Sequence, residues 1–179
     1  MTPGAPESQS DPAWRLDHDR RYTIDQHQFG VEGEADSDDR FGSALAVGDI
    51  DGDGYDDLAV GDPREDIDPV TDAGFVRVSY GASIGLTNET QILHQGTAGV
   101  PGANETGDDF GSRLLLSDLD GDGKDDLTIA AGNENGGNGA LVVLPSSGEQ
   151  LTTTGARALT ATAFGLPTAG QPHIGVRIG

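Results

Sequence analysis

The sequence predicts an all-β protein made of repeated units, each with short antiparallel strands. Its apolar runs are short, are bounded by Gly, Asp, Asn or Pro, and lack the length and 3.6-residue period of a helix. The chain also repeats itself at a fixed spacing, and both copies carry an acidic, glycine-containing loop between their first two apolar runs. These three observations favour repeated β-units over a helical or mixed fold.

The repeat is long and well preserved. Residues Ser37–Gly61 recur as Thr106–Ala130 at a constant offset of 69, and Gly74–Ser83 match Gly139–Gly148 at an offset of 65. The second copy is therefore four residues shorter between these blocks. A third copy begins near the end of the chain, where Ile174-Gly175 takes the place of a Phe-Gly pair. Such a period indicates units that bury their apolar faces against one another.

Each unit contains four predicted strands. In the first copy they lie in FGSALAVGDI, DDLAVG, GFVRVSYG and ETQILHQ, at residues 41–50, 56–61, 74–81 and 89–95. Four antiparallel strands in a unit of this size describe one blade of a β-propeller. We expect the wholly apolar first strand to be innermost and buried on both faces, and the more polar fourth strand to form the outer edge.

The repeat divides the chain into five predicted segments. They are a flexible acidic and polar arm (1–20), the outer strand of a preceding blade with a linker (21–38), a first blade (39–107), a second blade (108–171) and the first strand of a following blade (172–179). A closed propeller needs at least four blades. The chain is then a fragment of a longer reading frame, a protomer whose copies assemble, or an open partial ring with exposed faces prone to self-association.

The acidic loop predicts a cation site. Its pattern, D-x-D-G-D-G-x-D-D, occurs at residues 49–57 and 118–126. Oxygen atoms at positions one, three, five, seven and nine can wrap a hard cation of calcium size, while the glycine at position six permits a sharp turn. We therefore expect two Ca²⁺ sites. The candidate ligands are the carboxylates of Asp49, Asp51, Asp53 and Asp57 with the backbone carbonyl of Tyr55, and those of Asp118, Asp120, Asp122 and Asp126 with that of Lys124.

Two alternatives for this loop are weaker. An EF-hand requires a glutamate at position twelve and flanking helices, but position twelve is Val60 in one copy and Ile129 in the other, within predicted strands. A metal-free Asp-Gly hairpin would leave four carboxylates in close repulsion.

Catalysis is not expected either, because the G-x-S-x-G sequence at Gly81–Gly85 lies between two strands instead of in a strand-turn-helix.

Composition excludes several classes of partner. The formal charge of −21 and the isoelectric point near 4.1 argue against binding nucleic acid or an anionic membrane surface. Cysteine is absent, so the chain has no disulfide and no thiolate metal site. We expect no membrane span, because no apolar run approaches the ~18 residues that a span requires. No signal peptide is visible at the N-terminus.

The order of motifs resembles a known family. Phe41-Gly42, an apolar strand, the acidic loop and a second strand ending at Gly61–Pro63 resemble the FG-GAP repeat of integrin α-subunit β-propellers and of bacterial integrin-like proteins, over residues 22–179. The sequence departs from the family at GDP, where Gly-Ala-Pro is usual, and at AAGN in the second copy. The resemblance implies part of a seven-bladed propeller, stiffened by calcium and located outside the cell or at its surface.

Two functions remain open. The first is a calcium-binding structural, adhesion or ligand-binding module without catalysis, whose ligand is a protein or a glycan. The second is an accessory propeller segment of a larger secreted enzyme, such as a hydrolase. A catalytic domain in the same reading frame would decide for the second.

Overall fold

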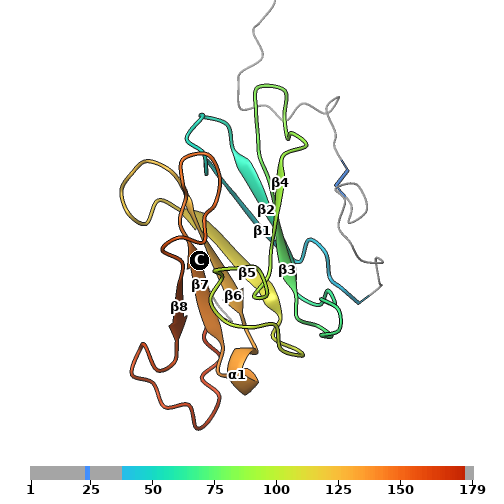
Figure 1. Ribbon diagram of the computed structural model, residues 1–179, viewed down its shortest axis with the longest axis vertical. Helices are drawn as coiled ribbons and strands as arrows, with labels where there is room; N and C mark the ends of the chain where they lie inside the picture. Colours follow the sequence, from blue (N-terminus) through green and yellow to red (C-terminus); the bar gives the residue numbers. More distant parts are fainter. Residues whose placement is uncertain (1–22, 25–37, 176–179) are drawn as a thin grey trace, which may run out of the picture.

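Two four-stranded antiparallel sheets make up the fold, as the sequence predicts. The computed structural model describes residues 23–24 and 38–175 of the chain. The first sheet contains β1 (Ala44–Gly48), β2 (Asp57–Asp62), β3 (Phe75–Ser79) and β4 (Thr90–Leu93), and the second contains β5 (Phe110–Ser117), β6 (Asp126–Ala131), β7 (Ala140–Leu144) and β8 (Arg157–Thr160). Figure 1 shows the two sheets side by side, with both acidic loops projecting from the same end.

Within each sheet the strands pair in sequence order, so each sheet is a simple meander. The polar fourth strand lies at the outer edge, as predicted. Among the described residues, the helical segment is a single turn, α1 (Glu134–Gly137). Asn135 and Gly136 have positive φ angles within it, which makes this turn irregular.

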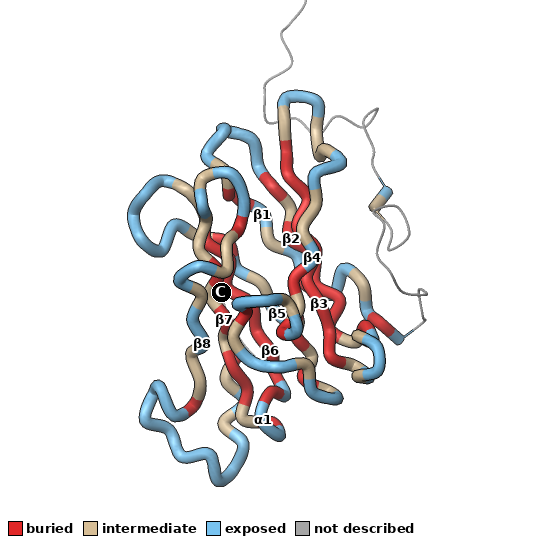
Figure 2. The backbone as a smooth tube through the Cα atoms, viewed as in Figure 1, coloured by how far each residue is buried: buried red, intermediate tan, exposed pale blue. Residues whose placement is uncertain are grey.

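The core lies between the sheets. In Figure 2 the buried segments run along β2, β3, β6 and β7, while the loops at both ends are exposed. Side chains from both sheets form one apolar cluster, which includes Ile50, Val76, Val78, Phe110, Leu127, Ile129, Val142 and Leu144. Both sheets contribute to this one cluster, so the two repeats pack against each other.

The expectation that the first strand is buried on both faces is wrong for both sheets. On β5, Arg113 and Leu115 are exposed on one face. On β1 the opposite face is open. Leu45 and Val47 are 61% and 60% exposed, whereas Ala46 on the opposite face packs against the core. The corresponding residues of β5, Leu114 and Leu116, pack against the same core. The first sheet covers that face of β5, but no described residue covers the equivalent face of β1.

Backbone atoms join the two repeats at the Phe-Gly motif. The Phe110 amide donates a hydrogen bond of 3.1 Å to the Ala73 carbonyl. Gly111 has a φ of +90°, and a Cβ there would lie 2.6 Å from the Phe75 carbonyl oxygen. A Cβ on Gly74 would likewise lie 2.3 Å from the Phe110 carbonyl oxygen. Only glycine permits this approach of two backbones.

The same junction recurs on the second sheet. The Ile174 amide donates to the Asn138 carbonyl at 2.8 Å, and a Cβ on Gly139 would lie 2.1 Å from the Ile174 carbonyl oxygen. Ile174 thus occupies on the second sheet the place that Phe110 occupies on the first. The N-terminal arm and the preceding strand, Tyr22–His27, fall almost wholly outside the described residues, as does the end of the segment 172–179. Within the described part, no helix is long and apolar enough to cross a membrane.

Candidate metal centres

The first acidic loop is organised by its own aspartates. The Asp49 carboxylate accepts hydrogen bonds from the amides of Gly52 at 2.7 Å and Gly54 at 3.0 Å. Both glycines have positive φ angles, +78° and +87°, which lets the chain curl around that carboxylate. Asp51 accepts from the amide of Asp53 at 3.0 Å. The sharp turn predicted at position six, Gly54, is therefore present.

The second loop repeats this arrangement. The Asp118 carboxylate accepts from the amides of Gly121 at 2.7 Å and Gly123 at 3.0 Å, whose φ angles are +84° and +87°. Asp120 accepts from the amide of Asp122 at 3.1 Å. The two loops share one local backbone design, as expected from their common sequence pattern.

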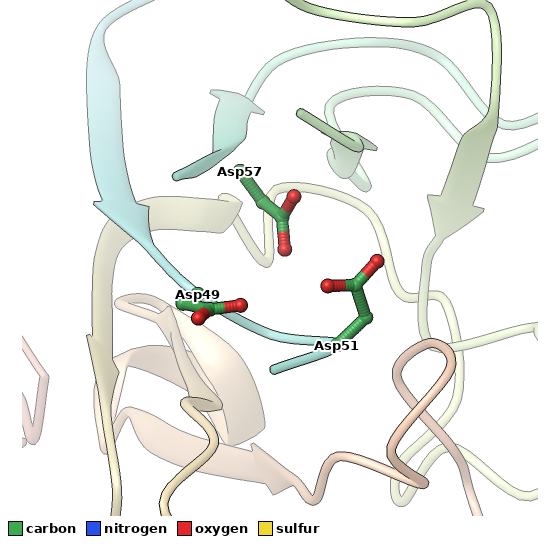
Figure 3. Close-up of side chains that lie close together, drawn as sticks. All are labelled: Asp49, Asp51 and Asp57. Atoms are coloured by element: carbon green, nitrogen blue, oxygen red, sulfur yellow. The ribbon is translucent and has the colours of Figure 1, made fainter. Parts of the chain in front are cut away.

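Carboxylates converge in both loops. In the first, one ligand atom from each of Asp49, Asp51 and Asp57 lies within 4.8 Å of the others, and Figure 3 shows these three side chains pointing toward one another. In the second, the group is formed by Asp118, Asp120 and Asp122, so its third member is at position five of the pattern instead of position nine. Calcium binds oxygen at about 2.3–2.6 Å, so two oxygens on one ion lie at most about 5 Å apart. The donor type and the spacing of both groups fit that ion.

Four other predicted ligands stand outside these groups of three. The carboxylate of Asp53 accepts from the Tyr55 amide at 2.8 Å, and the side chain of Tyr55 is exposed. The Lys124 ammonium pairs with Asp122 at 3.2 Å, and its amide donates to the same carboxylate at 2.9 Å. The fourth, Asp126, is buried. Assignment of all ten residues as ligands stays a prediction.

The aspartate at position nine also ties strands together. Asp57 is buried and accepts from the amides of Ile50 at 2.8 Å and Gly81 at 2.7 Å. Asp126 in the second repeat accepts from Leu119 at 3.2 Å and Ser146 at 2.9 Å. Each carboxylate thus links its own loop to the residues that follow the third strand of its sheet.

The surroundings of carboxyls in both loops shift their pKa values. Loss of water around the carboxyls raises the pKa of Asp51 and Asp57, and neighbouring aspartates raise both further, against the lowering effect of backbone hydrogen bonds. In the second loop, the hydrogen bond from Lys124 lowers the pKa of Asp122. The pattern of the first loop contains no basic residue, whereas that of the second contains Lys124.

Sequence reasoning missed the bonds between the two loops. The Asp49 amide donates to Asp125 Oδ2 at 3.1 Å, and the Asp125 amide donates to the Asp49 carbonyl at 2.8 Å. Ser146 Oγ also donates to the Ile50 carbonyl at 2.5 Å. A signal was present, because an aspartate occupies position eight in both copies, as Asp56 and Asp125, although that position has no role in the predicted ligand set.

Two successive antiparallel sheets, each with an acidic loop between its first and second strands, define this chain as a pair of β-propeller blades. The sequence model of the FG-GAP repeat matches it twice, at residues 41–79 and 110–144, which confirms the predicted resemblance. The chain therefore carries two FG-GAP repeats.

Three relatives among curated proteins share one name. The chain is similar to phosphatidylinositol-glycan-specific phospholipase D of Rattus norvegicus, with 36% identity over 114 residues. The corresponding proteins of Mus musculus and Bos taurus are 35% and 32% identical over the same length. The match covers 64% of this chain but spans only 13% of the rat relative.

Proposed function

We propose that this pair of FG-GAP blades is a calcium-stabilised structural, adhesion or ligand-binding module without catalysis of its own. The observation that carries the proposal is the convergence of three carboxylates in each loop, with ligand atoms within 4.8 Å of one another. Two such groups at the same place in two successive repeats support a cation role, because a hairpin turn alone does not require converging charge.

Bound calcium would offset the repulsion between carboxylates that the fold holds close together. Two carboxylates about 4 Å apart repel by roughly 1–4 kcal/mol at the dielectric of a protein surface or of water. The loop backbone holds Asp49 and Asp51 in place through amide hydrogen bonds, so these side chains cannot separate without breaking the turn. A bound divalent cation would supply positive charge between them and stabilise the start of β2.

Titration calorimetry on metal-free protein tests the proposal. We expect two sites with dissociation constants of about 10⁻⁵–10⁻³ M, the range of extracellular calcium modules. Asp49→Ala and Asp118→Ala should each remove one site, whereas Glu149→Ala, which removes an exposed charge outside both loops, should remove neither. If the unsubstituted chain shows no heat of calcium binding, the assignment of both loops as calcium sites is contradicted.

Thermal unfolding tests whether the metal is structural. Calcium should raise the melting temperature by an amount that grows with its concentration, and equal magnesium should do much less. Replacing Asp51 and Asp120 together by Asn should weaken this dependence and stabilise the metal-free chain, because Asn keeps an oxygen but not the charge. If calcium binds and the melting temperature stays constant, the loops serve a metal-dependent ligand contact instead.

The partner and location follow from the resemblance. FG-GAP propellers suggest a protein or glycan ligand and a secreted or cell-surface setting, and the net charge of −21 disfavours nucleic acid. Propeller ligands bind through loops. The connection between the second and third strands is four residues shorter in the second repeat than in the first.

The similarity to phospholipase D relatives favours a second candidate. Since the match spans 13% of the rat relative, these blades are proposed as an accessory segment of a larger secreted hydrolase. Sequencing the complete reading frame tests this candidate. A catalytic domain in the same frame would support it, and a frame containing only further blades would contradict it.

A further inference from the structure

We infer that Asp125 of the second repeat positions the first calcium loop, so that calcium affinity at the first site depends on the neighbouring repeat. This inference rests on the proposed calcium function. Asp125 is a positioning residue here: it acts on Asp49, a candidate ligand, and has no ligand role in the predicted pattern.

Two reciprocal hydrogen bonds fix the backbone of Asp49. Its amide donates to Asp125 Oδ2 at 3.1 Å, and its carbonyl accepts from the Asp125 amide at 2.8 Å. With both main-chain groups held, the direction in which the Asp49 carboxylate leaves the chain is set from the second repeat. A ligand placed in this way loses less conformational freedom when the ion binds.

The chain makes room for this contact. A Cβ on Gly48 would lie 2.1 Å from Asp125 Oδ2, so a residue with a side chain at position 48 would displace that carboxylate. The corresponding residue of the second repeat is Ser117, which carries such a side chain. The glycine at position 48 thus matches the aspartate that reaches across from the next repeat.

Two more contacts hold the first loop from the same side. Ser146 Oγ donates to the Ile50 carbonyl at 2.5 Å. The aliphatic part of Lys124 lies against Gly52, where a Cβ would be only 3.2 Å from Lys124 Cγ. The first loop therefore rests on three side chains of the second repeat, of which Asp125 alone bonds directly to a candidate ligand residue.

Asp56 provides a matched control. It occupies position eight of the first loop, as Asp125 does in the second, and it is exposed. Removing either side chain deletes one negative charge at the same place in the repeat. Only removal of Asp125 also deletes the acceptor of the Asp49 amide. A difference between the two variants therefore isolates the contact from the charge.

The test measures calcium binding by calorimetry on the full chain in an Asp118→Ala background, where the first loop is the remaining site. Asp125→Ala should weaken calcium binding there about tenfold, the size expected for loss of one charged hydrogen bond. Asp125→Asn should restore most of the affinity, because the Asn Oδ1 still accepts the amide. Asp56→Ala should change the affinity less than threefold. In an Asp49→Ala background, Asp125→Ala should leave the second site within the same threefold range.

Amide hydrogen exchange provides an independent measurement in metal-free protein without other substitutions. The Asp49 amide should exchange about tenfold faster in Asp125→Ala than in Asp56→Ala. Equal calcium affinities and equal exchange rates for these two variants would overturn the inference while leaving the calcium proposal intact. No calcium binding by the unsubstituted chain would overturn both.

Discussion

The backbone junction between the repeats can be tested with one pair of glycine substitutions. Gly42 and Gly111 hold the same position in the two Phe-Gly motifs and have similar φ angles, +77° and +90°. Their surroundings differ, because a Cβ on Gly42 meets nothing within 4 Å and one on Gly111 would lie 2.6 Å from the Phe75 carbonyl oxygen. Substitution by alanine therefore separates backbone strain from the clash at the junction.

The expected losses can be worked out from these two terms. A positive φ costs an alanine about 1–2 kcal/mol at either position. At Gly111 the clash adds about 1–3 kcal/mol, since Gly111 and the Phe75 carbonyl both belong to strand backbones and cannot rotate away from each other. Gly111→Ala should thus lower the free energy of unfolding by about 2–5 kcal/mol, and Gly42→Ala by only about 1–2 kcal/mol.

Urea unfolding at fixed calcium concentration is the suitable assay, with the melting temperature as a second readout. For a chain of this size, each 1 kcal/mol corresponds to about 2–4 °C. Equal losses for both variants would refute the reasoning, because they would show that the close approach at Gly111 contributes nothing beyond its φ angle.

Two further predictions concern buried carboxylates. Asp57→Ala should lower the free energy of unfolding, measured in urea, by about 2–4 kcal/mol, because the amides of Ile50 and Gly81 lose their acceptor. Asp57→Asn should lower it less. Equal losses for the two variants would contradict the role of these hydrogen bonds. Burial raises the pKa of Asp108 to about 7 from 3.8, so the folded chain keeps a proton that the unfolded chain releases, and stability falls as the pH rises through that window. Asp108→Asn should gain stability relative to the parent chain between pH 4 and pH 8, by at most about 4 kcal/mol, and a difference independent of pH would contradict this reasoning.

Much of this fold could be predicted from local sequence. Short apolar runs, the offset of 69 residues and the Asp-Gly loops are local signals, and the order of strands follows from short connections. The turn of the first loop could also be predicted, because Gly52 and Gly54 can adopt the positive φ angles that it requires. Local chemistry decides these features.

Contacts between the repeats were harder to foresee. Asp125 bonds to a residue 76 positions away, and nothing in its own neighbourhood distinguishes it from Asp56. The exposure of Leu45 and Val47 depends likewise on which sheet faces β1, whereas an apolar pattern reports only that a face can be buried. Such features arise from the angle and spacing of whole sheets, which single residues do not encode.

The Phe-Gly junction has a consequence for how chains of this kind change length. Since the joint consists of amides, carbonyls and glycines, it is indifferent to the side chains around it, and a duplicated repeat would meet the same partners as the original. The Asp125 contact does depend on side chains, because the Asp125 carboxylate accepts a hydrogen bond from the loop of the preceding repeat. The second repeat has Ser117 where the first has Gly48. A copy of the second repeat placed after it would therefore keep the backbone joint but lack the room for a second contact of the Asp125 kind.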